Sequence, residues 1–255
     1  MKQYPLLAGL CCALLGNTAW PAPPQYTVAW RDKPPYHYIE NGQPRGFLLA
    51  RARAIFDAAG LSTRFVNEPQ KRIWANFQHG ATHYCSISWY RLPEREAAAQ
   101  FSQPIHEDLP HTILIAPGMA QRVQAHGTLE SLLSDTTLTL GAIEGVSYGP
   151  VLDQAIKTSK NQVMSRTVET TQMMRMLAVG RASFMFVDRE DWDFFRRKEK
   201  SAQNLVRYDL PNMPPGLRRY IVCSRDVPPD VMNKLNQAIA ATGGMNNPGH
   251  SKPAR

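Results

Sequence analysis

The chain has 255 residues, of which 29 are Lys or Arg and 21 are Asp or Glu, so its formal net charge is +8. With 43% hydrophobic and 20% charged residues, the composition is typical of a folded globular protein and excludes a disordered one. The basic residues are spread along the whole chain, and no zinc-finger, helix-turn-helix or aromatic-rich basic motif accompanies them, so we expect no nucleic-acid partner.

The first residues have the order of a secretory signal peptide. A basic start with Lys2 is followed by an uncharged apolar run at 6–15 and by the small residue Ala19, after which we expect cleavage; cleavage after Ala22 is the alternative. The apolar run is too short for a spanning helix, and no other segment is apolar enough to cross a membrane. We therefore predict a signal peptide at 1–19, or up to 22, and a mature chain that is periplasmic, monomeric and not membrane-spanning.

Strand-like and helix-like segments alternate along the rest of the chain. Short apolar or alternating runs predict strands at 26–30, 63–66, 83–88, 112–116, 138–143, 163–167, 183–187, 205–210 and 220–224. Apolar residues at helical spacing predict helices at 47–59, 70–79, 93–100, 128–133, 151–159, 170–179, 188–198 and 228–242. Because strands and helices alternate in two successive runs, the sequence predicts an α/β protein with two lobes.

Two cysteines, Cys85 and Cys223, remain once the signal peptide is removed, and each lies in or beside a predicted strand. In an oxidising compartment they could form a disulfide. Pairing requires neighbouring strands, which the sequence does not establish, so a disulfide and two buried free thiols both remain open. Two cysteines without clustered histidines do not make a usual metal site, so we expect no bound metal.

Two loops are candidate ligand contacts. The segment 145–149, which contains Gly145 and Ser147 and precedes a predicted helix, would present free N–H groups to an anion, although glycine-rich turns here are also common without a function. Tyr36, which follows a Pro-Pro pair beyond the first strand, is placed either to cover a ligand or to pack within its loop. No catalytic motif is present, so we predict neither catalytic residues nor a cofactor.

The segment that follows the strand at 83–88 carries a family resemblance. Arg95 lies six residues before Phe101, which begins a Phe-Ser-Gln-Pro element. This arrangement resembles the extracytoplasmic solute-binding proteins that include the polar amino acid receptors of ABC transporters, and the order of elements over 24–243 is similar as well. The resemblance implies that Arg95 holds a ligand carboxylate and that Asp188 accepts a ligand ammonium group.

The same resemblance implies a type II periplasmic-binding-protein-like fold with two lobes. Two hinge strands, near 104–112 and 210–219, would join them. We expect lobe one to comprise 23–108 and 216–243, lobe two to comprise 109–215, and a flexible tail to follow at 244–255.

The segment before Arg95 departs from the family pattern. A Ser-Trp-Tyr sequence at 88–90 stands where Gly-Ile-Thr is usual, and the larger side chains would narrow or reshape the pocket. Glu144 replaces a basic residue before the loop at 145–149 and would repel a carboxylate. An ordinary amino acid is therefore in doubt as the ligand, and a cationic, aromatic or other solute fits as well.

The predicted ligand contacts are Tyr36, Ser88, Trp89, Tyr90, Arg95, Gly145, Ser147 and Asp188. Two of them have a structural alternative, because Arg95 could pair with Glu94 and Asp188 stands where a helix N-cap would. An arginine that pairs with a carboxylate through two hydrogen bonds, together with aromatic rings that stack on a ligand, suits a small charged solute.

The predicted function is the capture of a small polar or charged, amino-acid-like solute between the lobes, for an inner-membrane transporter or a sensor. Contacts to both lobes would favour the closed state. Two alternatives remain, namely a periplasmic enzyme of dehydratase type on the same fold and a signalling protein that is not coupled to transport. Glu144 or His106 could serve such an enzyme as general acid or base, although we expect His106 at the surface of the hinge.

Overall fold

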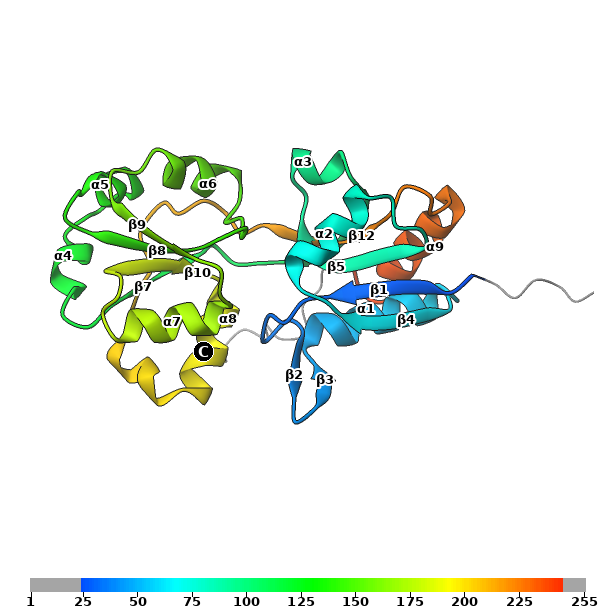
Figure 1. The fold of residues 1–255 in the computed structure, drawn as a ribbon, viewed down its shortest axis with the longest axis horizontal. Helices are drawn as coiled ribbons and strands as arrows, with labels where there is room; N and C mark the ends of the chain where they lie inside the picture. Colours follow the sequence, from blue (N-terminus) through cyan, green and yellow to red (C-terminus); the bar gives the residue numbers. More distant parts are fainter. Residues whose placement is uncertain (1–23, 245–255) are drawn as a thin grey trace, which may run out of the picture.

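The computed structural model describes residues 24–244, which form two α/β lobes side by side, each with its own five-stranded sheet (Figure 1). The predicted signal peptide, at 1–19 or 1–22, lies outside the described residues, and so does the predicted tail beyond Gly244. In the described part of the chain, no helix is both long enough and apolar enough to cross a membrane.

Lobe one contains both ends of the described chain. Its sheet consists of β1 (Tyr26–Trp30), β4 (Thr63–Asn67), β5 (Tyr84–Tyr90), β6 (Gln100–Glu107) and β12 (Arg218–Cys223). The strand order is β4-β1-β5-β12-β6, and β12 is antiparallel to both of its neighbours. The remaining elements are a hairpin of β2 (Tyr38–Glu40) and β3 (Gln43–Arg45), and the helices α1 (Phe47–Ala58), α2 (Gln70–Gln78), α3 (Pro93–Glu96) and α9 (Pro229–Ala241).

Lobe two is formed by the middle of the chain. Its sheet consists of β7 (Thr112–Ile115), β8 (Thr139–Ile143), β9 (Gln162–Arg166), β10 (Phe184–Val187) and β11 (Val206–Tyr208). The strand order is β11-β7-β10-β8-β9, with β8, β9 and β10 parallel. Its helices are α4 (Ala120–Gln124), α5 (Leu129–Ser134), α6 (Pro150–Lys157), α7 (Thr170–Ala178), α8 (Arg189–Lys198) and the 3-10 helix η1 (Lys200–Asn204).

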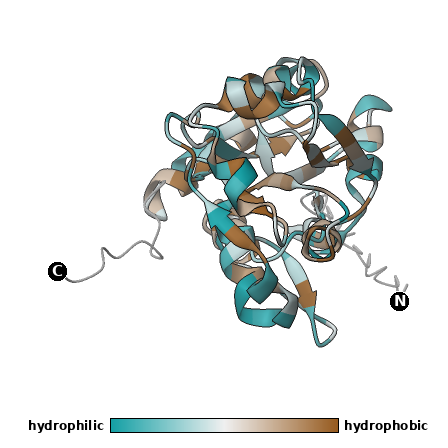
Figure 2. Ribbon diagram, turned by 90° about the vertical axis from the view of Figure 1, so that its left-hand side faces the viewer, coloured by the Kyte–Doolittle hydropathy of each residue, from teal (hydrophilic) through white to brown (hydrophobic). Residues whose placement is uncertain are grey.

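Each lobe has a hydrophobic core of its own. In lobe one, side chains of α1 and α9 pack on one face of the sheet and side chains of α2 on the other. All seven residues of β5 are therefore buried, as expected for a central strand covered on both faces. Figure 2 shows the same pattern, with hydrophobic residues along the strands and hydrophilic residues on loops and outer helix turns. Because the cores are separate, the lobes can move as two units.

Two connections join the lobes, at 108–111 and 209–217. They pass close together, and the N–H of Asp108 donates a hydrogen bond to the carbonyl oxygen of Leu217 at 2.9 Å. A Cβ atom at Gly216 would lie 1.6 Å from the carbonyl oxygen of Asp108. Only glycine allows this approach, so the two connections are held together where the lobes meet.

Several segments differ from the sequence predictions, among them β2, β3 and η1, which were not predicted. The hinge predicted near 104–112 begins too early, because β6 continues in lobe one as far as Glu107. The helix predicted at 93–100 is the single turn α3, because Gln100 already pairs with Cys223 in the sheet. The short helix α4 was not predicted, since its five residues are too few to show a helical repeat.

The two cysteines face each other across β5 and β12. Cys85 and Cys223 are opposite residues in the antiparallel register, and both are fully buried. Their Cα atoms are 4.0 Å apart, and the structure joins their sulfur atoms in a disulfide. Of the two outcomes left open by the sequence, the structure has the disulfide. It links two strands that both reach the boundary between the lobes.

Candidate functional site

A small cavity of about 30 Å³ lies between the lobes. Residues at the carboxyl ends of β1, β5, β8 and β10 line much of it, so both lobes contribute. This is where the open edge of a parallel sheet usually binds ligands. The volume accommodates about two water molecules, so a solute requires the lobes to separate or lining side chains to move.

Two arginines stack on one indole ring at the lobe-one end of the cavity. Arg31 follows β1 and Arg95 lies in α3, and their guanidinium carbons are 5.0 and 5.2 Å from the ring centroid of Trp89. These are cation–π distances. We call Arg31, Arg95 and Trp89 the arginine side of the cavity. Among residues 24–244, neither guanidinium has an ion-pair partner: Arg31 donates to the side chain of Gln70 and Arg95 to a backbone oxygen.

The surroundings of the two guanidiniums lower the pKa of each. Burial and then the charge of Arg219 lower the pKa of Arg31. Burial and then the charge of Arg31 lower the pKa of Arg95 to about 10. The Nε atom of Arg31 is buried without a hydrogen-bond partner. A carboxylate would relieve both the repulsion and the missing hydrogen bond.

Ser88 provides a hydroxyl beside these cations. In the register of β5 and β12, Ile221 is opposite Ile87 and Tyr220 is opposite Trp89, so Ser88 is an extra, bulged residue. Its φ angle is 70°, in the left-handed region that non-glycine residues rarely adopt. Ser88 is 1% exposed and lines the cavity, yet its Oγ atom has no hydrogen-bond partner. A strained residue with an unsatisfied buried hydroxyl is expected where a ligand binds.

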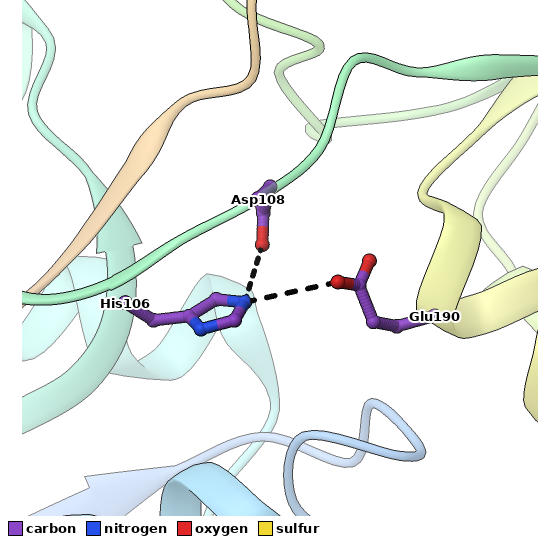
Figure 3. A group of neighbouring side chains, drawn as sticks. All are labelled: His106, Asp108 and Glu190. Atoms are coloured by element: carbon purple, nitrogen blue, oxygen red, sulfur yellow. Dashed lines mark ion pairs between the residues drawn. The ribbon is translucent and has the colours of Figure 1, made fainter. Parts of the chain in front are cut away.

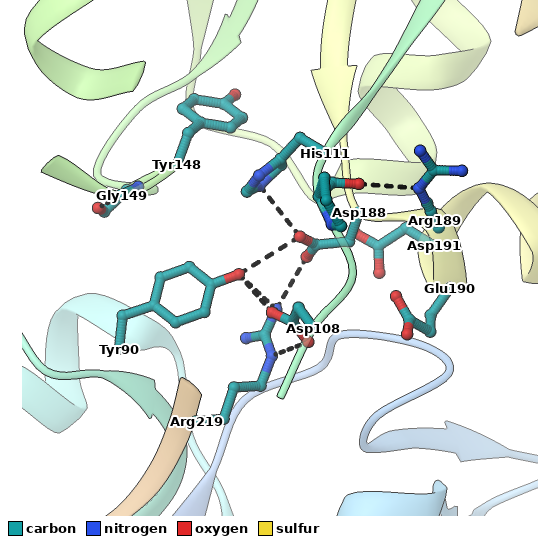
Figure 4. A network of polar contacts seen from close by, with 12 residues as sticks. Tyr90, Asp108, His111, Tyr148, Gly149, Asp188, Arg189, Glu190, Asp191 and Arg219 are labelled. Carbon is teal, nitrogen blue, oxygen red and sulfur yellow. Dashed lines mark hydrogen bonds and ion pairs between the residues drawn. The ribbon is translucent and has the colours of Figure 1, made fainter. Parts of the chain in front are cut away.

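A network of buried ion pairs, most of which Figure 4 shows, also borders the cavity. Lys33 Nζ lies 2.9 Å from Oδ2 of Asp188 and 2.5 Å from Oδ2 of Asp191. Arg219 Nη2 lies 2.9 Å from Oδ2 of Asp188 and 2.7 Å from Oδ2 of Asp108. We call these five residues the ion-pair side; each is at most 7% exposed. Since the two cations belong to lobe one, and Asp188 and Asp191 to lobe two, the pairs cross the gap between the lobes.

Asp188 is the centre of this network. Its other oxygen, Oδ1, is 3.1 Å from Nε2 of His111 and accepts a hydrogen bond from the hydroxyl of Tyr90 at 3.3 Å. Burial by itself would raise the pKa of Asp188, but the charges of Lys33 and Arg219 outweigh burial and hold that pKa well below its usual range. Asp188 is also the N-cap residue of α8, although its side chain makes no capping hydrogen bond. Its carboxylate serves the contact between the lobes.

The hinge contains a second buried group of titratable side chains, shown in Figure 3. Nε2 of His106 lies 3.1 Å from Oδ1 of Asp108 and 3.9 Å from Oε1 of Glu190. His106 is fully buried. The prediction that it lies at the hinge surface is therefore wrong, because β6 turns this side chain inward toward the carboxylates of the hinge and of α8.

Hydrogen-bond donors of the predicted anion loop, at 145–149, already have acceptors within the protein. The carboxylate of Asp153, in the first turn of α6, accepts hydrogen bonds from the N–H of Tyr148 at 2.7 Å and from the hydroxyl of Ser147. The N–H of Gly149 donates to Oγ of Ser147 at 3.1 Å. The expectation that this loop presents free N–H groups to an anion is thus corrected for Tyr148 and Gly149, because Asp153 takes the place of the anion.

The structure gathers most, though not all, of the predicted contacts around the cavity. The predicted residues that line it are Ser88, Trp89, Tyr90, Arg95, Ser147 and Asp188. Tyr36 lies behind the ion-pair side, where its hydroxyl is 3.3 Å from Oδ1 of Asp108 and 3.2 Å from Oε2 of Glu190, so it does not cover the cavity. Gly145 is not a lining residue either, and its carbonyl oxygen accepts a hydrogen bond from Gln70 of the other lobe.

Three lining cations were missed by the sequence predictions: Arg31, Lys33 and Arg219. Arg31 and Lys33 follow the end of β1. Their position could have identified them as candidates, because residues there border the ligand side of a parallel sheet. Arg219 had a weaker signal, a charge inside a strand whose other residues, Arg218 apart, are apolar. Its partners were out of reach of the sequence, since Asp108 is 111 positions away.

The fold and the cavity together define a two-lobed binding protein of the type II periplasmic class, with its site between the lobes. A family model described as bacterial extracellular solute-binding proteins, family 3, matches residues 26–243. The chain belongs to this family. A comparison with curated protein sequences found no match.

Solved structures with the same fold come from several kinds of protein. An ancestral amino acid-binding protein, a precursor of cyclohexadienyl dehydratase, has a TM-score of 0.68 at 17% identity and covers 85% of this chain and 88% of its own. A histidine kinase sensor domain has a TM-score of 0.68 at 17% identity, with coverages of 86% and 90%. The substrate-binding protein of an amino acid ABC transporter has a TM-score of 0.67 at 13% identity, with coverages of 87% and 95%. At these identities the likeness concerns the fold.

Proposed function

We propose that the protein captures a small, charged solute between its lobes in the periplasm and presents it to an inner-membrane transporter. The observation that carries this proposal is the arginine side of the cavity. Arg31 and Arg95 point cationic groups into a site shared by both lobes, without an ion-pair partner among the described residues. Two partly buried cations that lack a counterion are unfavourable in a folded protein, and an anion bound beside them would relieve that cost.

Closure of the lobes follows from the same contacts. A solute that touches Arg95 of lobe one and the lining residues of lobe two stabilises the closed arrangement by its additional contacts there. Gln70 of lobe one already donates to the carbonyl oxygen of Gly145 in lobe two, beside Arg31. A bound solute would add its own contacts to this hydrogen bond between the lobes and so stabilise the closed form. The closed form would then mark the protein as loaded.

Binding by Arg95 can be tested with a matched pair of variants. Arg95→Ala should weaken the binding of a carboxylate solute by roughly 2–5 kcal/mol, as for one partner of a buried charge pair. Arg91→Ala, which removes an exposed arginine paired with Glu96, should leave binding unchanged. Isothermal titration calorimetry of the mature protein, after a thermal-shift screen for solutes, measures both. Equal affinities of Arg95→Ala and wild type would contradict the assignment.

A sensor is the second candidate function, favoured by the similarity of fold to a histidine kinase sensor domain. Both candidates predict binding without turnover. The two differ in the partner that recognises the closed form, a transporter or a kinase. Incubating the protein with the bound solute and analysing the mixture by mass spectrometry tests the common prediction, because chemical conversion of the solute would indicate an enzyme instead.

A further inference from the structure

We propose that the solute is a small organic anion without an ammonium group, a dicarboxylate held by Arg31 and Arg95 with Ser88. This inference rests on the proposed function and narrows its ligand. It follows from the contrast between the two sides of the cavity. One side has cations that need an anion, and on the other side the acids are already paired with the protein's own cations.

The acid that would receive an ammonium group is occupied. Oδ2 of Asp188 contacts both Lys33 and Arg219 at 2.9 Å, and Oδ1 contacts His111 and Tyr90. A solute ammonium could reach this carboxylate only by displacing one of those cations. The displaced cation would be left buried without a partner, which is strongly unfavourable.

The other acids of this side leave little room for a solute cation. Both oxygens of Asp108 are bonded to Arg219 or to tyrosine hydroxyls. Asp191 has one free oxygen, Oδ1, but its other oxygen lies 2.5 Å from Lys33. Burial, only partly offset by the charge of Lys33, raises the pKa of Asp191 to about 7, so this carboxyl carries a full negative charge only above neutral pH.

The arginine side, in contrast, has unused donors. The Nε atom of Arg31 and the hydroxyl of Ser88 are buried and unpartnered, and both residues line the cavity. Five acids act on these arginines, all at a distance beyond that of an ion pair: Glu169, Asp188 and Asp191 on Arg31, and Glu94 and Asp153 on Arg95. Two guanidiniums and a hydroxyl offer several parallel donors, the pattern that suits the paired oxygens of a carboxylate.

The chemical class of the solute can be tested with pairs of probes that differ only by an ammonium group. We suggest succinate against aspartate and glutarate against glutamate, titrated calorimetrically into the mature protein. We expect the dicarboxylate of at least one pair to bind more than about tenfold more tightly than its amino acid.

An amino acid that binds as tightly as its partner, or more tightly, overturns this inference and leaves the proposed function standing. If neither member of either pair binds, the inference also fails. If the thermal-shift screen then finds no other solute, the proposed function fails as well.

Two variants assign the preference to the named residues. Arg31→Gln should lower the affinity for the bound dicarboxylate by more than about tenfold, while Arg72→Gln, an equal charge change at an exposed position of α2, should not alter it. Lys33→Met frees oxygens of Asp188 and Asp191, so it should shift the preference toward the amino acid of the same pair. An unchanged preference in folded Lys33→Met would contradict the role given to the ion pairs.

Discussion

The two sides of the cavity contain the same kind of side chain in opposite situations. Arg219, on the ion-pair side, lies between two carboxylates at 2.7 and 2.9 Å. Arg31 and Arg95, on the arginine side, contact an indole ring and neutral oxygens. A buried cation that has its partner stabilises the arrangement of the protein, whereas a cation without one is available to a solute. Burial alone therefore does not identify a binding residue, and the presence of a counterion separates the two roles.

The same contrast applies to Asp188, the acid predicted to bind a solute ammonium group, because its carboxylate pairs with cations of the protein itself. Asp188 lies in lobe two, and both of its cations lie in lobe one. The pairs bring the lobes together in the way that a ligand ammonium would.

The largest effect is expected from removing the central cation of the ion-pair side. Arg219→Met leaves Asp108 and Asp188 buried beside fewer cations and should lower the free energy of unfolding by about 3–5 kcal/mol. The neighbouring Arg218→Met removes an exposed pair with Glu107 and should cost at most about 1 kcal/mol. Urea denaturation compares the two. Similar losses in both variants would mean that the network is not the stabilising element.

The disulfide covalently links two strands that carry residues of both sides of the cavity. β5 carries Ser88 and Trp89, and β12 carries Arg219. Replacing Cys85 and Cys223 with alanine should lower the free energy of unfolding by about 2–5 kcal/mol, since the bond closes a long loop of the unfolded chain. Mass spectrometry of the unreduced, denatured protein after treatment with a thiol-alkylating reagent checks the bond directly. Labelling of both cysteines under those conditions would rule it out.

The charge of Asp191 gives the ion-pair side a pH dependence. Burial raises its pKa to about 7 in the folded protein, above the value near 4 expected when unfolded. Between about pH 4 and 7 the folded state therefore holds a proton that the unfolded state releases. This contribution to stability is present at low pH and is lost as the pH rises toward 7. The stability of wild type relative to Asp191→Asn should fall over that range, and a constant difference in urea titrations would contradict the assignment.

The smallest effect on stability is expected on the arginine side. Arg31→Gln removes a cation that has no counterion and relieves its repulsion of Arg95 and Arg219, at the loss of stacking on Trp89. These changes oppose each other, so the free energy of unfolding should change by less than about 1 kcal/mol. A loss as large as that of Arg219→Met would place Arg31 among the structural residues and remove the contrast between the two sides.

Much of the fold and part of the site could be predicted from local sequence patterns. The helix of α1 follows from apolar residues at helical spacing, and Arg95 was found because it stands at a fixed distance from a Phe-Ser-Gln-Pro element. Local patterns did not show that Asp153 would fill the loop at 145–149, because a side-chain hydrogen bond depends on how the first turn of α6 folds back.

The sequence by itself predicted an alternation of strands and helices, and with it two α/β lobes. These features depend on hydrophobic periodicity, which is local. Only the tertiary structure decided which charges meet, because Lys33 and Asp191 are 158 positions apart and become neighbours only in the folded chain. Which arginine has a counterion and which lacks one depends on those long-range contacts.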